Sequence, residues 1–186
     1  MPKKAETPKE TNEDVFEIFI IADNIFSEQT TLSKQAYDKG RFGEIKENKI
    51  KYSLVEALYL LEKRKAVIKD SRDKTIDFDS FIKKVSKKEP NFWTRYVVFR
   101  DIRNRGYIIK TALKFGADFR VYDRGINPGQ DHAKWIVFPV KESDVLTWFD
   151  FSAKNRVAHS TKKSLLLACV DDEDDVTYWN VSWVRP

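Results

Sequence analysis

The chain has 186 residues, of which 41% are hydrophobic and 13% aromatic, so it is long and apolar enough to bury a core. Charged residues make up 34% of the chain with both signs mixed, a composition that excludes intrinsic disorder for most of the chain. The net charge of +5 favours a polyanionic partner, with nucleic acid ahead of an acidic membrane.

The N-terminal residues 1–14 are polar, with scattered proline and charge, and we predict a flexible tail there. No apolar run in the chain approaches the length of a membrane span or of a signal-peptide core. The lone cysteine, Cys169, cannot form an intrachain disulfide and lies in the apolar run LLLACV. We therefore expect a cytoplasmic protein with a reduced interior and no membrane contact.

Residues 15–89 are predicted to form a small N-terminal α/β domain. Its expected elements in chain order are a strand over 15–22, a mixed strand-and-turn stretch to residue 50, a helix that follows Ser53, a strand over 66–69 and a helix over 79–88. Ser53 and Glu56 have the spacing of a capping box, which marks the start of the first helix. Asp79 or Ser80 is expected to cap the second helix, and Pro90 marks the end of the domain.

Residues 90–186 are predicted to form a second α/β domain. Its expected elements are a helix over 91–105 that resumes over 107–116 after Gly106, strands over 117–125 and 133–140, a helical segment within 143–160, a buried strand over 163–170, an acidic turn over 171–175 and a last strand over 176–183. The segment INPGQDH joins the first two strands as a turn.

Tyr122 and His132 stand on either side of that turn, so the predicted hairpin brings them close in space. An imidazole, with a pKa of about 6.5, can give a proton to a leaving oxygen, whereas a phenol, with a pKa of about 10, needs nearby positive charge before it can take one. Residues 95–134 contain nine Lys or Arg against four Asp, an excess equal to that of the whole chain. The residues alone leave two alternatives open, a packing pair or an acid–base pair in a basic groove.

Metal chemistry has little support in the sequence, because two histidines and one cysteine at these spacings match no zinc pattern. One stretch imitates a metal-dependent nuclease: Asp38 is followed by the acid-x-Lys sequence EIK at 44–46. It lies among turn signals in the first domain, away from the basic segment. We expect no metal and no other cofactor.

Several stretches together resemble the archaeal tRNA-splicing endonuclease family, also called tRNA-intron endonucleases. They are SLVEALYLLE, YVVFRDIRNRGYIIKTALKFGADFRVYDRG, HAKW and RVAHSTKKSLLLACVDDEDDVTYWNVSWVRP, which together span Ser53 to Pro186. The resemblance implies an α/β N-terminal module, followed by a nuclease module whose central mixed sheet is similar to that of restriction endonucleases. It also implies cleavage of RNA without metal by three residues, Tyr122, His132 and Lys163.

In the chemistry that the resemblance implies, Tyr122 takes the proton of a ribose 2′-OH and that oxygen attacks its own phosphate. His132 protonates the departing 5′-oxygen, and Lys163 neutralises charge in the transition state. The substrate is precursor tRNA, cut at a bulge–helix–bulge to leave 2′,3′-cyclic phosphate and 5′-hydroxyl ends. The rival interpretation is a non-catalytic structural or RNA-binding subunit of the same assembly.

Further residues are expected to bind RNA or a second subunit. Arg156 corresponds to a family arginine that stacks on a flipped base, and Arg124 and Lys134 are basic neighbours of the proposed acid–base pair. The acidic run DDEDD contains Asp171, Asp172, Asp174 and Asp175, which the resemblance places between subunits. The last strand is expected to pair two chains edge to edge. The assembly would then be a homotetramer built as a dimer of dimers, or a heterotetramer with a structural subunit.

Overall fold

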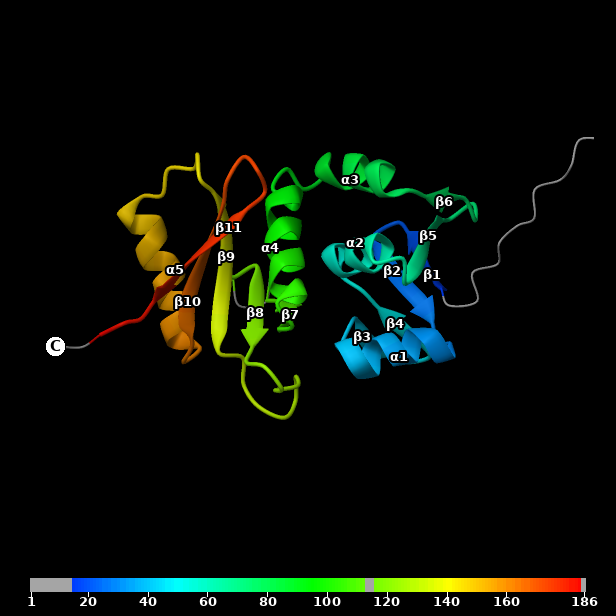
Figure 1. Cartoon of the computed structure of the whole chain (residues 1–186), viewed down its shortest axis with the longest axis horizontal. Helices are drawn as coiled ribbons and strands as arrows, with labels where there is room; N and C mark the ends of the chain where they lie inside the picture. Colours follow the sequence, from blue (N-terminus) through cyan, green and yellow to red (C-terminus); the bar gives the residue numbers. More distant parts are fainter. Residues whose placement is uncertain (1–14, 113–115, 185–186) are drawn as a thin grey trace, which may run out of the picture.

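The computed structural model describes residues 15–112 and 116–184, and Figure 1 shows its elements as two modules that lie side by side. The predicted flexible tail of residues 1–14 lies outside the described residues. None of the described helices combines the length and the apolar character that a membrane crossing needs.

The N-terminal module is built on a mixed sheet of six strands within the described residues. The strand order is β3 (Glu44–Lys46), β4 (Lys49–Lys51), β2 (Asn24–Glu28), β1 (Phe16–Ile21), β5 (Ala66–Asp70) and β6 (Thr75–Ile76). Strand β1 runs parallel to β5 and antiparallel to β2. Its alternate residues Phe16, Ile18 and Ile20 are buried, as expected for a strand that turns one face to a core.

Three helices accompany this sheet, namely α1 (Thr31–Gly40), α2 (Leu54–Glu62) and α3 (Phe78–Ser86). The predicted start of α2 is confirmed by a capping box. The Ser53 side chain accepts a hydrogen bond from the Glu56 amide, and the Glu56 side chain accepts one from the Ser53 amide. All residues from 55 to 60 are buried, so α2 is a core helix rather than a surface helix.

The C-terminal module has a five-stranded mixed sheet in the described part of the chain. Its order is β11 (Val176–Val181), β10 (Ser164–Val170), β9 (Trp135–Lys141), β8 (Phe119–Tyr122) and β7 (Ile108–Thr111). Strands β9 and β10 are parallel, and each other neighbouring pair is antiparallel. The prediction of an α/β protein whose second module has a central mixed sheet is confirmed.

Helices α4 (Phe92–Asn104) and α5 (Trp148–Ser160) cover opposite faces of this sheet (Figure 1). Successive residues of β9 show the division, because Val137 packs in the core that contains α4 whereas Ile136 and Phe138 pack with Ala158 of α5. Helix α5 connects the two parallel strands β9 and β10. This crossover brings the start of β10 to the same end of the sheet as the start of β9.

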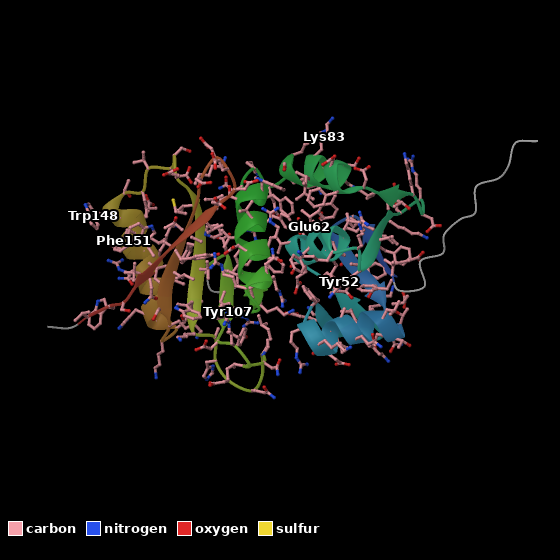
Figure 2. All side chains as sticks on the ribbon, in the orientation of Figure 1. Tyr52, Glu62, Lys83, Tyr107, Trp148 and Phe151 are labelled. Atoms are coloured by element: carbon pink, nitrogen blue, oxygen red, sulfur yellow. The ribbon has the colours of Figure 1, made fainter. Side chains whose placement is uncertain are left out.

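The two modules share a hydrophobic core. The cluster that contains Leu58 and Leu60 of α2 also contains Val98 and Phe99 of α4, all of them buried. The ring of Tyr59 meets that of Phe99 edge to face at a centroid distance of 5.8 Å. Figure 2 shows side chains filling the space between these helices. The predicted boundary at residue 89 falls in the turn between α3 and α4.

The prediction of a second helical stretch over residues 107–116 is wrong. Helix α4 ends at Asn104, and Gly106 has a φ of 86°, which turns the chain out of the helix. The next residues form strand β7, in which Ile108 pairs with Tyr122 of β8. Two consecutive β-branched isoleucines suit a strand better than a helix. Residues 113–115 of the predicted helix lie outside the described residues.

Two details of the N-terminal helices also differ from expectation. Residues 31–40 were predicted as strand and turn but form α1. This helix begins with a capping box between Thr30 and Ser33. Helix α3 has Asp77 as its N-cap rather than Asp79 or Ser80, because the Asp77 carboxylate accepts from the Ser80 amide at 2.9 Å.

Candidate active site

Tyr122 and His132 meet at one end of the C-terminal sheet. Tyr122 is the last residue of β8 and is only 5% exposed, while His132 lies on the exposed loop just before β9. Strands β8 and β9 are antiparallel, and the Lys134 amide donates to the Val121 carbonyl at 2.9 Å. The end of β8 therefore lies beside the start of β9, which brings the two side chains to the same place.

Lys163 reaches this place from a different connection. It stands between α5 and β10, where its amide donates to the Ala158 carbonyl at 2.9 Å and its ammonium donates to the Thr161 carbonyl at 2.8 Å. Because β10 is parallel to β9, both strands begin at the same end of the sheet. The sheet topology thus gathers residues that are up to 41 positions apart in the sequence.

Tyr122, His132 and Lys163 line a single cavity of about 390 Å³, which we call the Tyr–His–Lys pocket. Its other lining residues are Arg120, Gly129, Gln130, Asp131, Ala133, Ile136 and Thr161. The Arg120 guanidinium lies 6.0 Å from the centroid of the Tyr122 ring. The pocket is large enough for part of a nucleotide and holds a phenol, an imidazole and two cationic groups.

None of the three predicted RNA-binding residues, Arg124, Lys134 and Arg156, is in the lining of this pocket. The Lys134 ammonium donates to an Asp123 carboxylate oxygen at 2.8 Å, an interaction that holds the pKa of Asp123 below its ordinary value. The Arg124 guanidinium donates to the Arg105 carbonyl at 3.1 Å and lies 4.9 Å from the Tyr107 ring centroid. Arg156 is exposed on α5.

A second cavity of about 440 Å³ adjoins the first, and Lys163 lines both. Its lining residues are Lys134, Asn155, His159, Lys162, Lys163, Ser164, Ser182 and Trp183. The His159 ring packs against Trp183 at a centroid distance of 4.6 Å. Sequence reasoning missed Trp183, Gln130 and Thr161, since no spacing relates these residues to Tyr122 or His132.

The acidic turn 171–175 joins β10 to β11, as predicted, but its aspartates differ in their hydrogen bonds and exposure. An Asp171 carboxylate oxygen accepts from the amides of Glu173 and Asp175, both at 2.9 Å. An Asp174 carboxylate oxygen accepts from the Trp93 indole nitrogen of α4 at 2.7 Å. Asp172 and Asp175 are exposed. Asp171 and Asp174 thus hold the turn, and Asp172 and Asp175 present their carboxylates to solvent.

The residues that imitate a metal-dependent nuclease stay apart from the Tyr–His–Lys pocket. Asp38 lies on α1, and Glu44 and Lys46 lie on β3, where their charged groups are 4.0 Å apart. Within residues 15–112 and 116–184, no three His, Cys, Asp or Glu side chains are grouped so that they could hold a metal ion.

Both modules match known domain families. Residues 19–82 match the tRNA intron endonuclease N-terminal domain, and residues 92–178 match the tRNA intron endonuclease catalytic C-terminal domain. The Tyr–His–Lys pocket, lined by β8, β9, the loop between them and the connection from α5 to β10, therefore lies in a catalytic domain of the intron endonuclease class.

Several archaeal proteins named tRNA-splicing endonuclease are similar to this chain. The protein of Methanothermobacter thermautotrophicus is 40% identical over 158 residues, which cover 84% of this chain and 91% of the relative. That of Pyrococcus abyssi is 36% identical over 171 residues, covering 92% and 98%. That of Nanoarchaeum equitans is 41% identical over 139 residues, covering 72% and 88%. The chain belongs to the archaeal tRNA-splicing endonuclease family.

Proposed function

We propose that this chain is a catalytic subunit that cuts precursor tRNA at bulge–helix–bulge intron boundaries by metal-independent transesterification. The observation that carries the proposal is the single pocket lined by Tyr122, His132 and Lys163. We further propose that residues 15–89 and 90–186 are its two domains and that it works in the cytoplasm.

In the proposed reaction the nucleophile belongs to the RNA. Tyr122 takes the proton of the ribose 2′-OH, whose oxygen forms a bond to the adjacent phosphorus. The bond from phosphorus to the 5′-oxygen breaks, and His132 gives that oxygen a proton. Lys163, with Arg120 nearby, neutralises the charge that builds on the other phosphate oxygens. The products are a 2′,3′-cyclic phosphate and a 5′-hydroxyl.

Incubation of the purified protein with a bulge–helix–bulge RNA in excess EDTA tests this function. We expect cleavage at the two bulges and the two end groups named above. A metal-dependent nuclease would be silent in EDTA and active after Mg²⁺ is added. A structural subunit would bind the RNA and cut it under neither condition.

Replacing Tyr122 with Phe is expected to lower the single-turnover cleavage rate by about tenfold or more, because only a slower transfer to water remains for the 2′-OH proton. The ring still fills its buried site, so the fold should persist. Tyr37→Phe, in the N-terminal module, is the matched control. A Tyr122→Phe rate equal to that of the control would mean that Tyr122 only packs.

Three basic residues outside the lining of the pocket are proposed to hold the RNA. Arg156, exposed on α5, is assigned to stacking on a bulged base, and Arg124 and Lys134 to phosphate contacts. Lys134 already pairs with Asp123 and Arg124 with the Arg105 carbonyl, so both cations are held in place before RNA binds.

The assembly is proposed to be a homotetramer, as a dimer of dimers, or a heterotetramer with a structural subunit. Strand β11 lies at the edge of its sheet, and its residue Trp179 is 62% exposed, so the edge is open for pairing with a second chain. The acidic turn is proposed to enter a basic site on another subunit, where charge complementarity fixes orientation.

The two groups of carboxylates in the acidic turn allow a sharp test of docking. We expect the triple variant Asp172→Asn, Glu173→Gln, Asp175→Asn to keep the turn, because Asp171 and Asp174 still hold it, and to form dimers that no longer make tetramers and cut poorly. Light scattering that shows a full-size, fully active assembly would refute the docking role. Asp171 and Asp174 are left unchanged, because replacing them would also disrupt the turn, and a lost tetramer could then not be attributed to the lost charge.

A further inference from the structure

The segment 40–43 of the N-terminal module is clamped to the C-terminal module at both ends. The Arg103 guanidinium of α4 donates to the Gly40 carbonyl at 2.7 Å, and the Lys110 ammonium of β7 donates to the Gly43 carbonyl at 2.7 Å. Phe42, between them, is 6% exposed, and its ring centroid lies 4.1 Å from the Arg103 guanidinium carbon. The segment is therefore fixed relative to the catalytic sheet.

Arg41 uses this fixed segment to reach the loop that carries His132. It caps the C-terminus of α1 in the left-handed conformation, with φ 53° and ψ 34°. Its side-chain Nε donates to the Asn127 side-chain oxygen at 3.2 Å, across 86 residues of sequence. Asn127 lies in the loop between β8 and β9, five residues before His132.

The loop from Asn127 to His132 is a small unit held by its own hydrogen bonds. The Gln130 side-chain oxygen accepts from the Asn127 amide and side chain, at 3.3 and 3.1 Å, and the Gln130 amide donates to the Asn127 carbonyl at 3.0 Å. The His132 amide donates to an Asp131 carboxylate oxygen at 2.6 Å. Of the side-chain hydrogen bonds among the described residues, the one from Arg41 ties this unit to the rest of the protein.

We propose that Arg41 is a positioning residue for His132, through which the N-terminal module holds the catalytic loop in place. The proposal rests on the proposed role of His132 as general acid. His132 is exposed and stands on a loop rather than a strand, so the loop itself must set the position of the imidazole. A proton donor works only within hydrogen-bond reach of the leaving oxygen, and a displacement of about 1 Å is costly to the rate.

Arg41→Gly is the variant best suited to test this role, because glycine favours the left-handed cap and should preserve the fold. We expect its single-turnover cleavage rate to fall about tenfold while RNA affinity is unchanged. Asn127→Ala should show at least this loss, because it also removes the side-chain hydrogen bond from Asn127 to Gln130. Adding Arg41→Gly to Asn127→Ala should bring no further loss, because the contact between the two residues is already broken. Lys39→Ala, which removes a cation from the same helix end, should cut like the unmodified protein.

A second RNA distinguishes positioning from a structural effect. In this RNA the 5′-oxygen at the cleavage site is replaced by sulfur, and a thiolate leaves without protonation. Arg41→Gly and His132→Ala should both cut this RNA at the rate of the unmodified protein.

Three results would overturn the proposal. In the first, the sulfur RNA restores the cleavage rate of His132→Ala but not that of Arg41→Gly. This result would mean that Arg41 does not act through the general acid. Weakened binding with an unchanged rate would make Arg41 an RNA contact. If the cleavage rate of His132→Ala stays low on the sulfur RNA, His132 is not the general acid, and the positioning role of Arg41 fails with it.

Discussion

Replacing His132 with Ala is expected to lower the rate of the cleavage step by about 10²-fold or more, the usual size of a general-acid contribution. In the proposed mechanism, loss of the imidazole means that the 5′-oxygen must leave as an alkoxide or take its proton from water. Affinity for RNA should change little, because the cationic side chains that we propose bind phosphate are unchanged in this variant. Single-turnover kinetics with saturating protein measure the step directly.

The second histidine of the chain provides a matched control. His159→Ala removes the same group from the neighbouring cavity, where the ring packs on Trp183, and leaves the Tyr–His–Lys pocket intact. We expect it to affect binding more than the cleavage rate. A His132→Ala rate near that of the unmodified protein would remove His132 from the mechanism, and equal losses in the two variants would deny it a special role.

Much of the sheet framework could be predicted from local sequence, because apolar runs bounded by turn residues mark strands in either module. The runs at 117–125, 133–140 and 163–170 became β8, β9 and β10. The same local logic was wrong at 107–116, where pairing of β7 with β8 decided the outcome. Helix α1 was missed because its capping box uses Ser33 in place of the usual Glu or Gln.

The site was less accessible to sequence reasoning than the strands. The turn between Tyr122 and His132 suggested their proximity, but Lys163 entered the prediction only through the family resemblance. Its approach depends on the parallel pairing of β9 and β10, which no local pattern shows. The contact between Arg41 and Asn127 could not be predicted from the sequence, because it joins two modules through polar residues that no local pattern relates. Likewise, the run DDEDD predicted an acidic turn, but it did not show which of its carboxylates stabilise that turn.

A buried ion pair joins the two modules, and breaking it is expected to have the largest effect on stability. The Lys110 ammonium donates to a Glu56 carboxylate oxygen at 2.8 Å, and the two residues are 8% and 4% exposed. The same carboxylate accepts from the Gly43 amide and from the amide and hydroxyl of Ser53. Lys110→Met keeps most of the length of the side chain and leaves the buried carboxylate without the Lys110 charge.

We expect Lys110→Met to lower the free energy of unfolding by about 3–5 kcal/mol at neutral pH, the usual cost of removing one partner of a buried pair. Because the modules share a core, urea should unfold the variant in one transition at a lower midpoint. Lys49→Met, which breaks the exposed pair with Glu28, is the control and should change the midpoint little. Lys110→Met with Glu56→Gln should recover part of the loss, because Gln can replace Glu in a capping box.

The pH dependence of the same variant identifies the carboxylate as the cause. Burial by itself would raise the pKa of Glu56, but the charge of Lys110 and the hydrogen bonds from Lys110, Ser53 and Gly43 outweigh burial, so the pKa lies below its ordinary value. In the unmodified protein, Glu56 therefore stabilises the fold above the unfolded-state pKa of about 4.3, and this stabilisation is lost as the pH falls through the folded-state pKa.

In Lys110→Met we expect the sign to reverse, because burial without the Lys110 charge should raise the pKa of Glu56 above that of the unfolded chain. Protonation then relieves the uncompensated charge as the pH falls, so the stability difference between the two proteins should narrow from neutral pH to about pH 4.5. Urea unfolding at both pH values, at one protein concentration, measures the difference. A constant difference would show that Lys110 stabilises the junction by packing and by its bond to the Gly43 carbonyl rather than through the charge of Glu56.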